Sequence, residues 1–136
     1  MKEVKLYIIV REDLQMSPGK MAAQCVHAAF KYLMRKGRFF QEDLECQLAF
    51  HVYDGAPEFQ HFMTGRFGPP IIVIKKVKSE EQLRNILKKA EDAGLRTGAQ
   101  IDIGLHELEG ENFTAVAIGP NYVEDCEPIV TRLRNL

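Results

Sequence analysis

The residues best suited to chemistry in this sequence lie together in residues 17–29, which read SPGKMAAQCVHAA. Lys20, Gln24 and His27 are spaced i, i+4 and i+7, so on a helix they share one face. Ser17 is a good N-cap, which places Lys20 in the first turn, beside backbone N–H groups at the positive helix end. A lysine at this place can bind an anion or stabilise a developing oxyanion. An ordinary surface lysine is the alternative interpretation, since the spacing alone does not distinguish the two.

The other residues of this stretch are small or apolar. Met21, Cys25 and Ala28, together with residues 22, 23 and 29, are expected to pack on a sheet. The polar stripe then runs along the edge of a buried surface. For His27, a half-buried histidine with satisfied hydrogen bonds is an equally good interpretation.

The Gly-Lys pair also raises the question of a phosphate-binding loop. Such a loop needs a glycine five residues before the Gly-Lys pair and a Ser or Thr after it. Here Leu14 stands at the first position and Met21 at the second. The sequence therefore excludes this motif.

Asp102 is the second polar residue that stands out. It lies in the strand-like run AQIDIG, although aspartate is a poor strand residue. Paired with Lys20, its carboxylate would stay ionised and orient or activate a water molecule. An aspartate that caps the turn before a hairpin is the alternative.

Composition bounds the classes of protein that the chain can belong to. Its 136 residues suffice for one domain, taken as residues 1–136, and the net charge of −1 argues against non-specific coating of nucleic acid. No apolar run is long enough to cross a membrane, and the first residues lack the pattern of a secretory signal, so a cytoplasmic protein is expected. The three cysteines have neither disulfide nor zinc spacing, and no cofactor is expected.

Periodicity predicts the elements that must position these residues. Strands are expected at residues 5–10, 71–77, 99–104 and 113–118, and helices at about 18–36, 57–63, 79–93 and 122–133. A further helix is expected at residues 42–52. Long helical crossovers favour parallel strand pairs, and the short link at 104–113 favours one antiparallel pair. The prediction is a single compact α/β domain with a four-stranded mixed sheet flanked by helices on both faces.

Residues 10–29, VREDLQMSPGKMAAQCVHAA, resemble the opening of the archaeal and eukaryotic type 2 peptidyl-tRNA hydrolases. That family reads V-R-x-D-L-x-M-x-x-G-K-x-A-A-Q-x-x-H-A. The later strings AEDAGL, IDIG and AIGP are also similar to it, so the resemblance covers residues 5–36 and about 71–136. It implies hydrolysis of the ester that joins a peptide to the 3′ end of tRNA, without a metal, by a protein that is often a homodimer.

The resemblance also implies roles for particular residues. Lys20 and Asp102 match functional positions, and Gln24 and His27 match neighbouring polar positions. Where the family has Thr and Gln, this chain has His106 and Glu107. His106 can accept and donate protons and is taken as a third catalytic residue, with Glu107 beside it. The residues expected to hold the tRNA acceptor end are Lys31, Arg35 and Lys36.

These departures leave two alternatives open. One is an esterase of the same fold with a changed acyl substrate, which His106 and Glu107 favour. The other is a non-catalytic domain that binds tRNA or protein, which the near-neutral charge and the acidic residues 107–111 favour.

Overall fold

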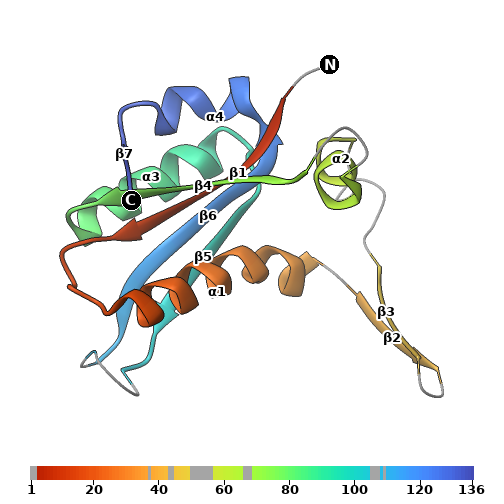
Figure 1. The fold of residues 1–136 in the computed structure, drawn as a ribbon, viewed down its shortest axis with the longest axis horizontal. Helices are drawn as coiled ribbons and strands as arrows, with labels where there is room; N and C mark the ends of the chain where they lie inside the picture. The colour runs from red at the N-terminus through yellow and green to blue at the C-terminus, as the bar shows by residue number, and fades with distance from the viewer. Residues whose placement is uncertain are drawn as a thin grey trace.

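The computed structural model of the chain describes residues 3–36, 38–42, 45–49, 57–65, 69–104, 108 and 110–136. A five-stranded mixed sheet forms its centre, in the order β5-β6-β1-β4-β7 (Figure 1). Its strands are β1 (Val4–Arg11), β4 (Ile71–Val77), β5 (Thr97–Asp102), β6 (Asn112–Tyr122) and β7 (Arg134–Asn135).

The expectation of four strands is wrong by one, because β7 joins the edge of the sheet. β7 has two residues and pairs antiparallel with Lys75 and Lys76 of β4. A strand of two exposed residues has no hydrophobic alternation, so periodicity cannot reveal it. The other four strands agree with the prediction within a few residues.

Strand β1 lies in the middle of the sheet. It runs parallel to β4, from Lys5 opposite Ile71 to Arg11 opposite Val77, and antiparallel to β6. β5 and β6 pair antiparallel across the 103–111 link, as the short connection predicts. Because β5 is an edge strand, side chains of a neighbouring helix can contact its end.

Four helices accompany the sheet: α1 (Pro18–Lys36), α2 (Pro57–Thr64), α3 (Glu80–Asp92) and α4 (Val123–Val130). The first three confirm their predicted positions. The expected last helix at residues 122–133 is too long, since the chain leaves α4 after Val130 to form β7. The start of α3 is capped by the Ser79 side chain, which accepts a hydrogen bond from the Gln82 N–H.

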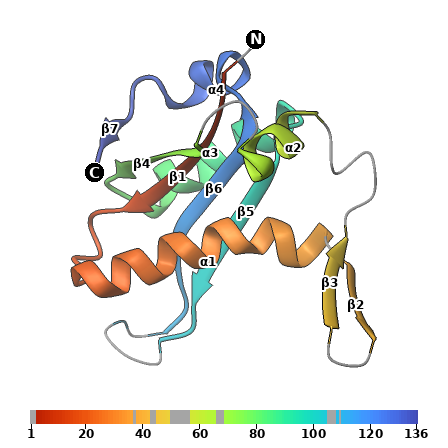
Figure 2. The same ribbon diagram turned by 45° about the vertical axis from the view of Figure 1, so that its right-hand side comes forward.

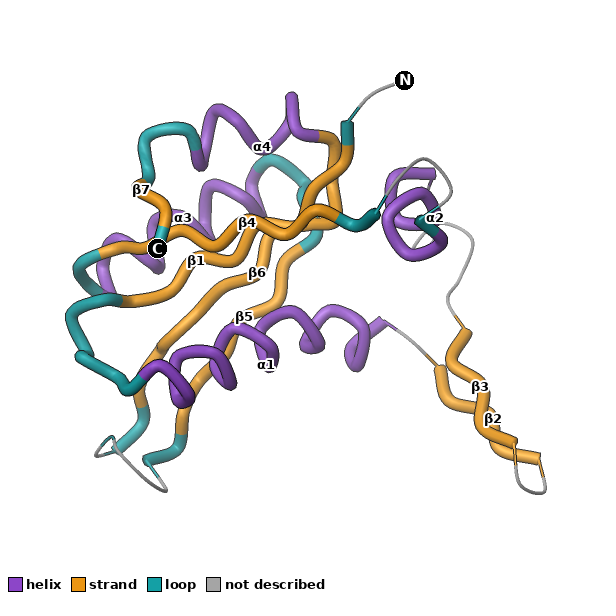
Figure 3. Tube along the Cα trace, in the orientation of Figure 1, coloured by secondary structure: helices purple, strands orange, loops and turns teal. Residues whose placement is uncertain are grey.

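The expected helix at residues 42–52 is wrong in the part that the structure describes. A separate antiparallel hairpin is found there, made of β2 (Arg38–Glu42) and β3 (Glu45–Ala49). Figure 3 shows it extending beyond the end of α1, apart from the five-stranded sheet. Here strand pairing with the segment at Phe39 and Phe40 prevails over local helix propensity.

Two buried clusters hold the helices on the sheet. Leu6, Ile8 and Val10 of β1 pack with residues of α1 and α2, whereas Tyr7 and Ile9 pack with residues of α3 and α4. This division follows from the strand geometry, because successive side chains point to opposite sides. Figure 2 shows α1 lying across the strands of the sheet, with its length close to β5 and β6.

Helix α1 meets the sheet through only part of the small-residue surface that the sequence suggested. Cys25 and Ala28 are buried, and Met21 packs against them, but Ala22 and Ala23 are exposed. At about 100° per residue, Ala22 and Ala23 fall on the outer side of the helix, with the exposed Val26. The inner surface of α1 is thus narrower than expected.

Candidate active site around Lys20 and Asp102

Lys20 and Asp102 form an ion pair where the first turn of α1 meets the end of β5. The Lys20 Nζ lies 2.6 Å from Asp102 Oδ1, and their side chains are only 11% and 9% exposed. The Ser17 side chain caps α1 by accepting a hydrogen bond from the Lys20 N–H, and Pro18 begins the helix. The capped first turn therefore sets where the lysine leaves the helix.

Asp102 accepts two further hydrogen bonds. The Gly104 N–H donates to Oδ2 at 3.0 Å, and Gln24 Nε2 donates to Oδ1 at 3.4 Å. The bond from Lys20 lowers the pKa of the Asp102 carboxyl; burial opposes this, and the Gly104 and Gln24 bonds add to it. The carboxylate is therefore ionised at neutral pH, although it is buried.

The turn after Asp102 depends on the glycine at 104. Gly104 has φ +79°, and a Cβ on it would lie 2.7 Å from the Gly110 carbonyl oxygen. Only glycine fits so close an approach of two backbone segments with a positive φ. This turn holds the Gly104 N–H against the carboxylate.

Sequence reasoning missed Thr114, which lies behind the ion pair on β6. Its hydroxyl donates a 2.5 Å hydrogen bond to Gln24 Oε1, and it is fully buried. Gln24 in turn is 2% exposed, so it is a buried link between Thr114 and Asp102. A threonine inside the apolar run FTAVAIG was the available signal.

His27 shares the predicted face of α1 with Lys20 and Gln24 but has a different partner. Its Nδ1 lies 3.3 Å from Nε2 of Gln100, a β5 residue that sequence reasoning also missed. Gln100 and Asp102 are two positions apart on β5. Residues at this spacing point to the same side of a strand, so both side chains face α1. In the sequence, the only indication of a role for Gln100 was its position two residues before Asp102, which places both on one side of a strand.

The structure does not place every predicted site residue. His106 and Glu107 lie outside the described residues, and so do the side chains of Arg35 and Lys36. Lys31 is exposed on α1. The described site therefore brings together Lys20, Gln24 and Asp102, with His27 one turn further along α1.

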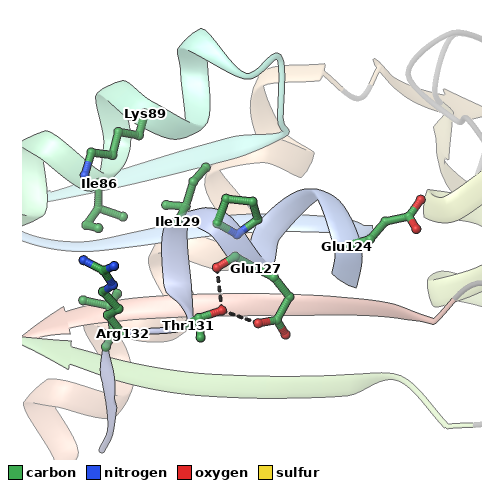
Figure 4. A pocket seen from close by; sticks show the side chains of 9 residues that line it. Ile86, Lys89, Glu124, Glu127, Ile129, Thr131 and Arg132 are labelled. Atoms are coloured by element: carbon green, nitrogen blue, oxygen red, sulfur yellow. Dashed lines mark hydrogen bonds between the residues drawn. The ribbon is translucent and has the colours of Figure 1, made fainter.

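Two open clefts lined by described residues lie elsewhere on the molecule. An open cleft of about 680 Å³ runs between α3 and α4, where Thr131 hydrogen-bonds Glu127 and the other walls include Lys89 and Arg132 (Figure 4). A smaller one of about 240 Å³ lies beside Lys5 and Lys75. Neither contains Lys20 or Asp102, and we assign the site by its buried charges rather than by cleft size.

Two further properties concern only the described residues. Among them, no group of three or more His, Cys, Asp or Glu side chains is arranged to hold a metal ion. None of their helices is both long enough and apolar enough to span a membrane.

The fold and the site together define an α/β protein with a buried lysine–aspartate ion pair beside its mixed sheet. Such a pair is an arrangement suited to electrostatic or acid–base chemistry. The sequence model of the family described as "Peptidyl-tRNA hydrolase PTH2" matches residues 4–136, and the chain belongs to this family. Its members are hydrolases that act on the ester bond of peptidyl-tRNA, so the chain is a peptidyl-tRNA hydrolase-like protein.

Individual relatives agree with this assignment. The chain is 32% identical to a peptidyl-tRNA hydrolase of Methanocaldococcus jannaschii, over 98% of this chain and 100% of that protein. It is 30% identical to the mouse mitochondrial peptidyl-tRNA hydrolase 2, over 97% of this chain but only 63% of that protein. The chain thus spans less than two thirds of the mouse relative.

A solved structure with a similar fold supports the architecture. It is that of an Agrobacterium protein of unknown function, with a TM-score of 0.58, 10% identity, and coverage of 100% of this chain and 99% of that one. At this identity the likeness concerns the fold alone.

Proposed function

We propose that this chain hydrolyses the ester bond between a peptide and the 3′ end of tRNA, with Lys20 and Asp102 at the reacting group. The observation that carries the proposal is the buried 2.6 Å ion pair between them. Burying two charges is costly and is weak evidence for stability. A function that needs a fixed cation and a fixed carboxylate explains why the chain keeps them.

The pair suits ester hydrolysis by water. Lys20 uses one N–H on Asp102 and has two left, which stabilise the negative oxygen that develops when water attacks the ester carbonyl carbon. The bond from that carbon to the ribose 3′-oxygen then breaks. The peptide leaves as a carboxylic acid, and the 3′-oxygen takes a proton and leaves as the tRNA hydroxyl.

Asp102 acts in this scheme by orienting water and Lys20. Because it accepts hydrogen bonds from Lys20, Gln24 and Gly104, it is a weak base and does not keep the proton of the attacking water. His106 remains our candidate for that role, since a histidine ordinarily exchanges protons near neutral pH. Glu107 is proposed to support it.

The tRNA part of the substrate is proposed to follow α1. Lys31 is exposed in the same stripe as Lys20 and His27, and Arg35 and Lys36 extend the positive charge toward the end of the helix. A few local cations suffice to position phosphates, even in a chain with a net charge of −1.

We also propose that the chain forms a homodimer and is located in the cytoplasm, as the resemblance and the composition imply. Light scattering of the purified chain tests the proposed homodimer.

The test compares two lysine variants with an N-acetyl-aminoacyl-tRNA as substrate. Lys20→Ala should lose about 100-fold or more in kcat/KM, the usual loss when one oxyanion donor is removed. Lys76→Ala is the matched control, because Lys76 also forms an ion pair, at 3.1 Å with Glu12, but lies on β4, which β6 and β1 separate from the β5 strand of Asp102. Its rate should stay within about twofold of the wild type.

Three results would contradict the proposal. An unchanged rate in Lys20→Ala would remove the lysine from the mechanism. A wild-type chain that binds tRNA without turnover would favour the non-catalytic alternative, and turnover of other acyl esters alone would favour a changed substrate.

A further inference from the structure

The Gln100 side chain has an unusual set of partners. It is 7% exposed, and its Nε2 lies 3.2 Å from the Ile101 carbonyl oxygen and 3.3 Å from His27 Nδ1. Its other end, Oε1, is buried and accepts no hydrogen bond from the described residues. Buried amide oxygens are normally satisfied, so this arrangement calls for an explanation.

The Ile101 carbonyl fixes which end of the Gln100 amide faces His27. Exchanging the two ends would place Oε1 about as close to the Ile101 oxygen, with no hydrogen between two acceptors. It would also leave an NH₂ group buried without an acceptor. The amide therefore presents an N–H to His27, and the unsatisfied Oε1 is the cost.

This orientation determines the state of the His27 ring. Since Nδ1 accepts the Gln100 N–H, it carries no hydrogen, and the ring hydrogen of the neutral imidazole resides on Nε2. His27 is exposed, and no described residue hydrogen-bonds its Nε2. Its Nε2–H is thus a fixed donor that is free to contact a ligand.

The place of His27 on α1 indicates which part of a substrate it meets. It follows Lys20 by seven residues, about 10 Å along the axis, too far for both to contact one carbonyl oxygen. It precedes the exposed Lys31 by four residues, or about 6 Å. The donor therefore lies between the proposed ester site and a cation suited to phosphate.

We infer that Gln100 is a positioning residue that holds His27 as an Nε2–H donor to a phosphate oxygen of the tRNA acceptor end. The tautomer follows from the contacts alone. The choice of ligand rests on the proposed function.

The first measurement is the ¹⁵N NMR spectrum of the His27 ring at about pH 8.5, where an ordinary histidine is neutral. The wild type should show one tautomer, with the Nδ1 shift of an acceptor nitrogen. Gln100→Leu should give the mixed tautomers of an unconstrained ring, and Gln100→Glu should move the hydrogen to Nδ1. Gln60→Leu, the same change at an exposed glutamine of α2, should leave the spectrum unchanged. A wild-type spectrum equal to that of Gln100→Leu overturns the inference.

The second measurement is the affinity for deacylated tRNA at fixed salt. His27→Phe removes the Nε2–H donor and should weaken it about 5- to 10-fold, the value of one hydrogen bond. Gln100→Leu only releases the tautomer and should weaken it by less, and Gln60→Leu should not change it. The melting temperature of Gln100→Leu should change little, because the substitution removes an unsatisfied oxygen but also the N–H that the Ile101 carbonyl accepts. An affinity that His27→Phe leaves unchanged would overturn the inference. Because neither measurement uses turnover, failure here is distinct from failure of the Lys20→Ala test.

Discussion

The Thr114 hydroxyl of β6 lies 2.5 Å from Gln24 Oε1 of α1 and 3.3 Å from the Gln100 carbonyl oxygen. Its single hydrogen goes to the nearer Gln24 oxygen, and so determines which end of that amide faces Asp102. With Oε1 engaged, Gln24 can present only its NH₂ group to the carboxylate, at 3.4 Å. A residue that does not touch Asp102 thereby helps to keep it ionised. The buried site is one connected network from Thr114 to Lys20.

Thr114→Val is expected to weaken this network. The substitution keeps the shape of the side chain but leaves Gln24 Oε1 buried without a donor. The free energy of unfolding should therefore fall by about 1–3 kcal/mol. Hydrolysis should also slow, because the Gln24 amide is free to turn. Thr131→Val is the control, since Thr131 is exposed and, among the described residues, its hydroxyl bonds Glu127 of α4. Denaturant unfolding and turnover measure both effects, and equal losses in the two variants would contradict this account.

Asp102→Asn is expected to be strongly destabilising at neutral pH. It leaves the mostly buried Lys20 without a counter-charge, which costs roughly 3–5 kcal/mol. Glu12→Gln breaks the more exposed pair with Lys76 and should cost under about 1 kcal/mol. Chemical denaturation of both variants at pH 7 gives the comparison.

The destabilisation by Asp102→Asn should depend on pH in a definite direction. Because folding lowers the pKa of Asp102, its contribution is complete above the ordinary aspartate value of about 3.9 and is lost as pH falls through the folded value. The stability difference from the wild type should therefore be constant from pH 5 to 7 and shrink only in acid below that range. A difference that already shrinks between pH 7 and 5 would contradict the lowered pKa.

Gly104→Ala tests the close turn after Asp102. The alanine meets a positive φ and places its Cβ 2.7 Å from the Gly110 carbonyl oxygen. Gly94→Ala is matched in φ, at +72°, but has open space around the added Cβ. The Gly94 variant should lose only about 1–2 kcal/mol for the left-handed backbone, and the Gly104 variant should lose more stability and activity. Similar losses in both would mean that the contact with Gly110 relaxes easily.

The buried thiols should be inert in the folded protein. Burial raises the pKa of Cys25 to about 11, and burial together with the charges of Asp125 and Glu127 raises that of Cys126 to about 12. The reactive thiolate is therefore scarce at pH 8. Mass spectrometry after brief N-ethylmaleimide treatment should find both unmodified in the native state and modified after unfolding. Rapid native labelling of Cys25 would indicate that α1 opens from the sheet.

Much of the site could be predicted because its signals are local. The spacing of Lys20, Gln24 and His27 defines one helix face, and the structure confirms that they lie along it. The suggested pairing of Lys20 with Asp102 is confirmed as a contact. It could be predicted because an aspartate at a strand end is anomalous on propensity alone.

The network behind the pair could not be predicted in the same way. Thr114 and Gln100 are ordinary strand residues until the pairing of β5 with β6, and the packing of α1 on both, brings them to Gln24 and His27. The residues joined are 90 and 73 positions apart in sequence. Sequence patterns report neighbours within a turn or a strand, and contacts at such separations depend on register and packing.

By itself, the sequence determined the helical face with its cation, the main strands, and the family to which the chain belongs, since these depend on local spacing and on motif residues. Only the tertiary structure decided that Asp102 is buried yet ionised, that Thr114 and Gln100 orient the amide and the imidazole beside it, and that residues 38–49 form a hairpin. The physical reason is the same in each case. Hydrogen-bond partners, desolvation and strand pairing are set by groups far apart along the chain, which only folding brings within reach.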